Sequence, residues 1–408
     1  MEISNELIAI VIPVWIILLG GFLSAFLITG SFIPSLIKLA RLKGLYDLPN
    51  GRTSHLRATP YLGGIAVFAG FVITTILMTR TDILPELIYL LAGFIILLFI
   101  GLKDDILRIN PLHKLAGQLI AAGIIAVFAD VRINNLYGCF GFEGIPYIPS
   151  ILITMFVFIV IINGSNLIDG IDGLASGVCI LISLTLGIWF TASGFIPYAV
   201  MCFSLAGALI AFFYFNVFGK KNKIFLGDTG SLILGLALSV LIVRFIGYQS
   251  IAPKPLVIHS APAVAFGILI IPLFDTLRVF ILRISQRRSP FSADRQHLHH
   301  LLLDIGYSHI QTTSILLLSN LFFIVASVGL QQLKIMHLIS LQLLVATGLS
   351  FLAAQLLKRK REQRYFQKGF IGKEIQLLTV NGSDNQFEGD KTATPKRKSP
   401  HLMKISNA

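Results

Sequence analysis

The sequence predicts an all-α polytopic membrane protein with about eleven transmembrane helices, on the basis of its composition, its long apolar runs and its distribution of basic residues. Of 408 residues, 55% are hydrophobic and 13% are charged, and the mean hydropathy is +0.81. A soluble domain of this length could not bury so much apolar surface. Several runs exceed the roughly 18 residues needed to cross a hydrocarbon core of about 30 Å.

The hydropathy pattern places the membrane segments in order along the chain. The expected spans lie near residues 7–29, 62–80, 86–102, 113–130, 148–166, 173–192, 197–217, 230–246, 261–284, 312–331 and 336–357. The first segment is long, lacks a basic start and has no clear cleavage site, so we expect a retained span rather than a signal peptide. After about residue 366 the sequence becomes polar. We therefore expect a membrane domain at 1–365 and a disordered tail at 366–408.

Lysine and arginine collect in one set of loops, which the positive-inside rule assigns to the cytoplasm. That set contains Lys38, Arg41, Lys43, Arg52, Arg57, Lys103, Arg108, Lys114, Lys220, Lys221, Lys223, Arg283, Arg287, Arg288, Arg295, Lys358, Arg359, Lys360, Arg361 and Arg364. The opposite loops hold little beyond Arg132, Lys254 and Lys334. We expect a multi-pass protein of the plasma (inner) membrane, with its N-terminus outside and its tail in the cytoplasm. Topology also explains most of the net charge of +13, and no recognised motif indicates a nucleic-acid partner.

Acidic residues stand at the ends of three apolar segments, all on the expected cytoplasmic face. Asp104 and Asp105 follow the third span, Asp169 and Asp172 follow the fifth, and Asp228 precedes the eighth. A charge near the bilayer needs a partner, a cation or a water-filled cavity. The three clusters therefore predict one site for a metal and a polyanion.

The stretch NGSNLIDGIDGLASG carries an amide or a carboxylate at every third position. Its polar residues are Asn163, Asn166, Asp169 and Asp172. On a straight helix this spacing drifts by about 60° per step, so the side chains would point in different directions. Gly170 and Gly173 allow the helix to end or unwind, and irregular backbone at this depth indicates a polar cavity or a site buried in protein.

The stretch KIFLGDTGSLILG places Asp228 between Gly227 and Gly230. The glycines would let the backbone approach phosphate closely, and a following helix start could offer N–H donors. The carboxylate is a hard oxygen ligand suited to Mg²⁺. Taken alone, the string could also be an ordinary helix cap.

Two basic segments complete the expected site. DRQHLHH offers a guanidinium and three imidazoles, which suit a metal-bound diphosphate; zinc at His297 and His300 is the alternative, although no cysteine lies nearby. RTSHLRATPYLGG offers His55, either as a substrate contact or within a solvated basic loop.

Together these motifs resemble the polyprenyl-phosphate N-acetylhexosamine-1-phosphate transferases. The matching strings are GLKDD, NGSNLIDGIDGLA, FLGDTGSL and the HLHH of DRQHLHH, which occur in the family's order within residues 7–360. The chain looks most similar to the bacterial undecaprenyl-phosphate GlcNAc-1-phosphate transferases. The branch that transfers phospho-MurNAc-pentapeptide usually carries three consecutive histidines, and here Leu298 interrupts the run. The carboxyl tail departs from the family.

The resemblance implies a glycosyl-1-phosphate transferase domain at 1–365, with its active site on the cytoplasmic face. It would transfer GlcNAc-1-phosphate from UDP-GlcNAc to undecaprenyl phosphate and release UMP, using Mg²⁺ or Mn²⁺. Another UDP-N-acetylhexosamine or UDP-MurNAc-pentapeptide stays open as the donor, and a homodimer stays open as the assembly.

The resemblance also implies residue roles. Asp104, Asp105 and Asp228 would be catalytic, and Asp228 with Asn166 would bind the metal. The expected substrate contacts are Asn163, Asp169, Asp172, Asn216, His55, Arg295, His297, His299 and His300.

Three other classes fit the residues less well. A polyprenyl synthase needs a DDxxD motif, but the fifth position here is Arg108. A CDP-alcohol phosphatidyltransferase needs Ala-Arg after Asp-Gly, where this chain has Ile171 and Asp172. A secondary transporter would place its charges near the middle of the bilayer rather than on one face.

Overall fold

The computed structural model describes residues 13–47, 58–79, 83–139, 144–289 and 296–383. The chain forms two compact units, Met1–Ala354 and Gln355–Ala408. All elements that surround the acidic clusters belong to the first unit. The helical backbone of the second unit continues to Ser383, through part of the segment that the sequence assigned to a tail.

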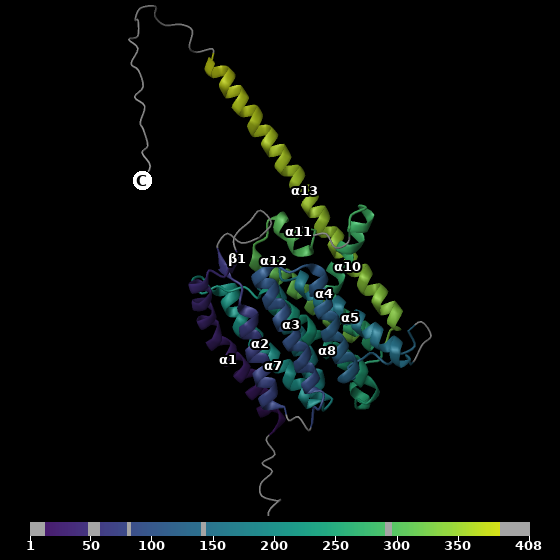
Figure 1. Cartoon of the computed structure of the whole chain (residues 1–408). Helices are drawn as coiled ribbons and strands as arrows, with labels where there is room; N and C mark the ends of the chain where they lie inside the picture. Colours follow the sequence, from purple (N-terminus) through teal and green to yellow (C-terminus); the bar gives the residue numbers. More distant parts are fainter. Residues whose placement is uncertain (1–12, 48–57, 80–82, 140–143, 290–295, 384–408) are drawn as a thin grey trace, which may run out of the picture. The chain divides into compact units, whose positions relative to one another are not determined.

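The described residues form an almost entirely helical protein (Figure 1). The helices are α1 (Val14–Lys43), α2 (Gly63–Met78), α3 (Leu87–Leu107), α4 (Pro111–Phe128), α5 (Tyr147–Leu167), α6 (Leu174–Ala192), α7 (Ile196–Phe213), α8 (Gly227–Gly247), α9 (Ala261–Ile268), α10 (Ile270–Ser285), α11 (Leu298–Ile305), α12 (His309–Gly329) and α13 (Ile335–Ser383). A π-helical turn, Tyr214–Phe218, extends α7. The short strands β1 (Tyr46–Asp47) and β2 (Thr59–Pro60) pair antiparallel.

The predicted class, an all-α multi-pass membrane protein, is confirmed. Among the described residues, nine helices are long and apolar enough to cross a membrane, and the bent pair α9–α10 would make a tenth. The segment expected near residues 62–80 is α2, an apolar helix of 16 residues. Each expected span therefore corresponds to a helix or to the bent pair.

The ninth expected span is broken rather than continuous. Helices α9 and α10 meet at an angle of 81° around Leu269. Pro272 has no N–H to donate, and its ring would clash with the carbonyl of Ile268 four residues earlier, which explains a break at this point. Before α9, Ser260 Oγ donates a hydrogen bond to Leu333 O at the α12–α13 connection. After α10, His299 packs over Gly170, next to Asp169, so the bent pair leads from the α12–α13 connection to the acidic cluster that follows α5.

Helix α8 is the central helix of the bundle. Its apolar window is 89% buried, and it contacts α2, α3, α5, α6 and α9. Glycines permit these contacts: a Cβ on Gly101 of α3 would lie 2.4 Å from Thr229 Cα, and one on Gly64 of α2 would lie 2.2 Å from Gly230 N. The close approach brings the end of α3 that carries Asp104 and Asp105 against the start of α8. This end of the bundle is termed the acidic end.

Gly101→Ala should lower the thermal stability of the protein, because its methyl group would enter the backbone of α8. Overpacking of this kind costs about 1–3 kcal/mol. Gly123→Ala on α4 is the matched control, since its Cβ would meet only Met155 Cε, at 3.7 Å. That variant should be neutral or slightly stabilised, because alanine favours helix by roughly 1 kcal/mol. The measurement is the unfolding midpoint of each variant in detergent. Equal midpoints for the two variants would contradict the close approach of α3 and α8.

Candidate active site

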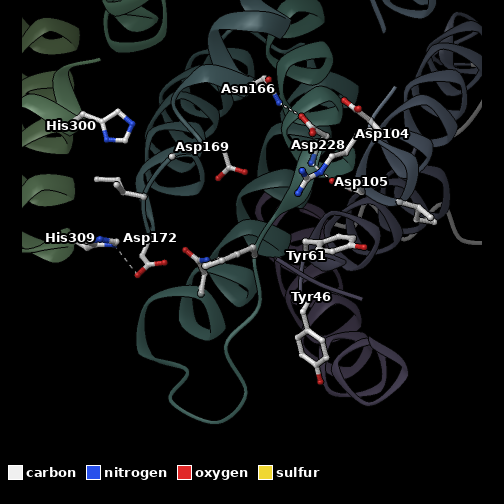
Figure 2. A pocket seen from close by; sticks show the side chains of 17 residues that line it. Tyr46, Tyr61, Asp104, Asp105, Asn166, Asp169, Asp172, Asp228, His300 and His309 are labelled. Atoms are coloured by element: carbon white, nitrogen blue, oxygen red, sulfur yellow. Dashed lines mark hydrogen bonds and ion pairs between the residues drawn. The ribbon is translucent and has the colours of Figure 1, made fainter. Parts of the chain in front are cut away.

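A cavity of about 600 Å³ opens at the acidic end, where all three acidic clusters meet (Figure 2). It is lined by Tyr46, Tyr61, Asp104, Asp105, Ile106, Arg108, Asn166, Asp169, Gly170, Ile171, Asp172, Asn216, Phe225, Gly227, Asp228, His300 and His309. The predicted convergence of the three clusters on one site is therefore what the structure shows.

The helix that carries the start of the Asn/Asp repeat ends just before Gly170, in agreement with the prediction made from Gly170 and Gly173. Helix α5 ends at Leu167, and α6 begins after Gly173, whose φ is +75°. Asn216 stabilises this break from inside the protein: its Oδ1 accepts a hydrogen bond from Gly173 N at 2.7 Å, and its Nδ2 donates to Ile224 O at 2.9 Å. Asn216 thus links the α5–α6 break to the segment that precedes α8.

Asp105 caps the start of α8 from a different helix. Its Oδ1 accepts a hydrogen bond from Asp228 N at 2.7 Å, and its Oδ2 accepts from Thr229 N at 3.0 Å and Thr229 Oγ1 at 2.6 Å. These are N–H groups that a helix cannot satisfy internally, and a carboxylate is favoured at the positive end of the helix dipole. Asp105 therefore orients the turn from which Asp228 projects.

Asp104 points in a different direction from Asp105, as expected for adjacent positions on a helix. Its Oδ1 accepts a hydrogen bond from Ile109 N at 2.9 Å, and its Oδ2 lies 3.0 Å from Lys114 Nζ. Lys114 Nζ also lies 2.6 Å from Asp228 Oδ1. One ammonium group is thus shared by two carboxylates, whereas Asp105 bonds to the start of α8.

The residues around Asp228 suit a hard divalent cation. Asn166 Nδ2 lies 2.6 Å from Asp228 Oδ1 and 2.7 Å from Ser231 Oγ, so an amide and a carboxylate already adjoin. No group of three His, Cys, Asp or Glu side chains within the described parts of the chain could hold a metal unaided. Mg²⁺ usually takes only one or two carboxylates and completes its shell with water and substrate phosphates. The donor set therefore fits Mg²⁺.

Asp169 lines the cavity together with the carboxylates of Asp105, Asp172 and Asp228. Its enclosed position, together with the carboxylates of Asp228, Asp105 and Asp172, raises the pKa of Asp169 well above its usual range. Across the described ranges no basic side chain forms an ion pair with it. A cation bound beside Asp228 would relieve this repulsion.

Asn163 lies away from Asp169 and Asp172, the last two members of its repeat. It lines a second cavity of about 260 Å³, where its Nδ2 donates to Gln118 Oε1 at 2.9 Å. Asp104 and Asn166 line both cavities, so the two spaces adjoin. The drift of about 60° per step explains the separation, because Asn163 stands on the regular part of α5 and Asp172 stands beyond its end.

The three histidines of HLHH occupy three different environments. Only His300 lines the main cavity. His297 is 4% exposed and its Nδ1 lies 2.9 Å from Asp275 Oδ2. His299 is 2% exposed and packs over Gly170, where a Cβ would lie 2.4 Å from its Nε2. The other two predicted substrate contacts on basic segments, His55 and Arg295, lie outside the described residues.

Several residues that line the cavity or bond to Asp172 were not singled out by the sequence analysis. His309 Nδ1 and Lys223 Nζ lie 3.2 Å and 2.6 Å from Asp172 Oδ2, and Thr313 Oγ1 donates to Asp172 O at 2.7 Å. Burial opposes ionisation of Asp172, but the hydrogen bonds from His309 and Lys223 outweigh it and hold the pKa of this carboxyl below its usual range. Arg108 enters the cavity from the end of α3 with a φ of 49°. No local pattern marks His309, whereas Lys223 and Arg108 had been noted only for their charge.

Comparison with known proteins gives matches that include these elements. A model of glycosyl transferase family 4 matches residues 87–246, from α3 to α8. The undecaprenyl-phosphate alpha-N-acetylglucosaminyl 1-phosphate transferase of Escherichia coli strain K12 is 31% identical over 310 residues, covering 75% of this chain and 82% of that protein. The Salmonella typhi protein of the same name is 31% identical over 315 residues, covering 76% and 83%. The decaprenyl-phosphate N-acetylglucosaminephosphotransferase of Mycolicibacterium smegmatis is 33% identical over 289 residues, covering 65% and 70%.

The buried ring of His299 should make the protein less stable in mild acid. Burial, reinforced by the neighbouring His300, lowers the pKa of His299 from 6.5 to about 3. The unfolded chain therefore binds a proton near pH 6.5 that the folded chain does not bind, so stability falls as the pH drops from about 6.5 toward 3. At pH 5 the loss should be about 2 kcal/mol.

The measurement is the unfolding midpoint at pH 7.5 and pH 5 for the wild-type protein, His299→Asn and the exposed control His259→Asn. The midpoint should fall less for His299→Asn than for the wild type, and His259→Asn should behave like the wild type. An equal fall for all three would show that His299 does not titrate differently in the folded protein.

Proposed function

Since this chain belongs to the polyprenyl-phosphate N-acetylhexosamine-1-phosphate transferases, we propose that it transfers GlcNAc-1-phosphate from UDP-GlcNAc to undecaprenyl phosphate and releases UMP. The observation that carries this proposal is the meeting of Asp104 and Asp228 at the shared ammonium of Lys114, with Asn166 bonded to Asp228. The reaction brings two anionic phosphates together. A site of this kind supplies an ammonium group and hard oxygen ligands for a metal at the place where the two phosphates meet.

The two adjoining cavities suit the two substrates. The smaller one is lined by Ile109, Pro111 and Leu115 as well as by Lys114, so an anionic head and the first part of an apolar chain fit its composition. In the larger one, Phe225 supplies an aromatic surface beside Asp172 and Asn216. We assign the smaller cavity to the acceptor phosphate and the larger one to the UDP-sugar.

The proposed metal is Mg²⁺, with Mn²⁺ as a substitute. Asp228 and Asn166 would hold it, and it would offset the charge of the diphosphate and of the leaving UMP. Lys114 can exchange its ion pair with Asp104 for one with the incoming acceptor phosphate, because both groups face the smaller cavity.

The two carboxylates of GLKDD have different proposed roles. Asp105 uses both oxygens to hold the start of α8, so it positions Asp228 and does not contact the acceptor. Asp104 adjoins both cavities and is the residue proposed to hold or deprotonate the acceptor phosphate.

The activity is tested with purified protein, undecaprenyl phosphate and a panel of radiolabelled UDP-sugars. Label from UDP-GlcNAc should enter a butanol-extractable lipid only with Mg²⁺ or Mn²⁺. Asp228→Asn should reduce this transfer by at least about a hundredfold, since even partners beyond the metal ligands contribute about 10–100-fold. Asp130→Asn, at an exposed aspartate paired with Arg132, is the matched control and should keep full activity.

Preference for another UDP-N-acetylhexosamine or for UDP-MurNAc-pentapeptide would replace the donor in this proposal. No lipid product from any donor would refute the activity. Undiminished metal-dependent transfer by Asp228→Asn would remove that residue from the metal site.

The active site is proposed to face the cytoplasm of a bacterial plasma membrane. In a Cys139→Ser background, single cysteines at Asn222 and Arg288 should react with an impermeant maleimide only from the cytoplasmic side, and one at Asn135 only from outside. The asymmetry of lysine and arginine along the chain is the reason. The opposite labelling pattern would overturn both the orientation and the cytoplasmic location of the site.

A further inference from the structure

Asp275 of α10 holds the start of the histidine segment although it does not line either cavity. The residue is 2% exposed. Its Oδ2 lies 2.9 Å from His297 Nδ1, and its Oδ1 accepts a hydrogen bond from Leu298 N at 2.9 Å. Arg278, one turn further along α10, reaches both Asp275 Oδ1 and the carbonyl of Gln296. Both carboxylate oxygens are therefore committed to the same short segment.

These contacts compensate for a weakness of α11. This helix has eight residues, and its N-cap residue, His297, makes no capping hydrogen bond with its own side chain. So short a helix is unstable on its own, and its first N–H groups need acceptors. Asp275 supplies an acceptor from α10 at the first N–H group of α11.

Contacts between the three histidine rings connect the start of α11 with the main cavity. The rings of His297 and His299 are nearly parallel, with centroids 5.8 Å apart and an interplanar angle of 11°. The ring of His299 lies 4.2 Å from that of His300 and packs over Gly170 in the α5–α6 break. A continuous series of contacts thus connects Asp275 with His300, the one member of the group that lines the cavity.

We propose that Asp275 is a positioning residue for the transfer reaction: by binding His297 and the first N–H group of α11, it orients this helix so that His300 faces the donor substrate. The inference rests on the proposed function for its kinetic consequence. Its structural content, the orientation of His300, is independent of the reaction.

The kinetic test is a double-mutant cycle between Asp275 and His300. Asp275→Ala should lower kcat/KM for UDP-GlcNAc by about 10–100-fold, since misplacement of a contact by about 1 Å can cost a hundredfold. In a His300→Ala background the same change should cost less than about threefold, because its effect acts through His300. Asp275→Asn should retain most of the activity, since its amide can still accept from Leu298 N and face His297.

The matched control is Thr276→Val on the next position of α10, whose hydroxyl, among the residues that the structure describes, donates to Pro272 O within the helix. It should leave kcat/KM and the unfolding midpoint unchanged. If Asp275→Ala does not fold, His297→Phe replaces it in the cycle, since it removes the contact between Asp275 and His297 while keeping a ring.

A second readout does not depend on turnover. A cysteine at His300, in the Cys139→Ser background, is labelled with a water-soluble maleimide, since Cys179 and Cys202 are buried. Asp275→Ala should change the labelling rate severalfold, whereas Thr276→Val should not. Equal labelling rates would overturn the positioning role. So would a loss of kcat/KM from Asp275→Ala that is equally large with and without His300→Ala. A protein that shows the labelling change but no turnover with any UDP-sugar would refute the proposed function and leave the orientation of His300 supported.

Discussion

The capping of α8 by Asp105 is the interaction on which the rest of the site depends. The helix begins with a glycine of positive φ and offers two N–H groups to a carboxylate from α3. The pairing requires α3 and α8 to approach more closely than side chains would normally allow, which Gly101 permits. Asp228 then leaves the helix in a fixed direction, and Lys114 and Asn166 meet it from α4 and α5. Four helices thus contribute to one small region because one helix start is capped in this way.

Side-chain amides are the second organising feature. A helix that ends below a membrane surface exposes N–H and C=O groups that water cannot reach, so protein groups must satisfy them. Asn216 does this for the α5–α6 break by bonding to both Gly173 and Ile224. On the regular part of α5, Asn163 bonds to Gln118 of the neighbouring helix. Neutral side chains therefore help to hold the irregular backbone that carries Asp169 and Asp172, and both of these residues line the cavity.

The sequence predicted the helices and the meeting of the acidic clusters because both follow from local patterns. Hydropathy depends on neighbours in the chain, and charges at the ends of spans must gather at one end of a bundle. Asn163 was assigned with Asp172 because they share a spacing, but the direction of each side chain depends on where α5 ends. His297 was grouped with His300 because the two are close in the sequence. Its partner Asp275 lies 22 residues earlier, in a segment that the sequence analysis identified only as a membrane span. His309 was missed because its partner, Asp172, lies 137 residues away.

The bend between α9 and α10 also determines which sequence changes this region can tolerate. Before the bend, packing limits the size of each side chain, since a Cβ on Gly267 of α9 would lie 1.9 Å from Ser327 Oγ. After the bend, the direction of a side chain around the helix axis matters as well, because Asp275 must face His297. One residue inserted between Ile271 and Asp275 would rotate the carboxylate by about 100° around the helix axis. The hydropathy of the span would scarcely change, yet the histidine segment would lose its anchor, so insertions and deletions in α10 should be far rarer among relatives than apolar replacements.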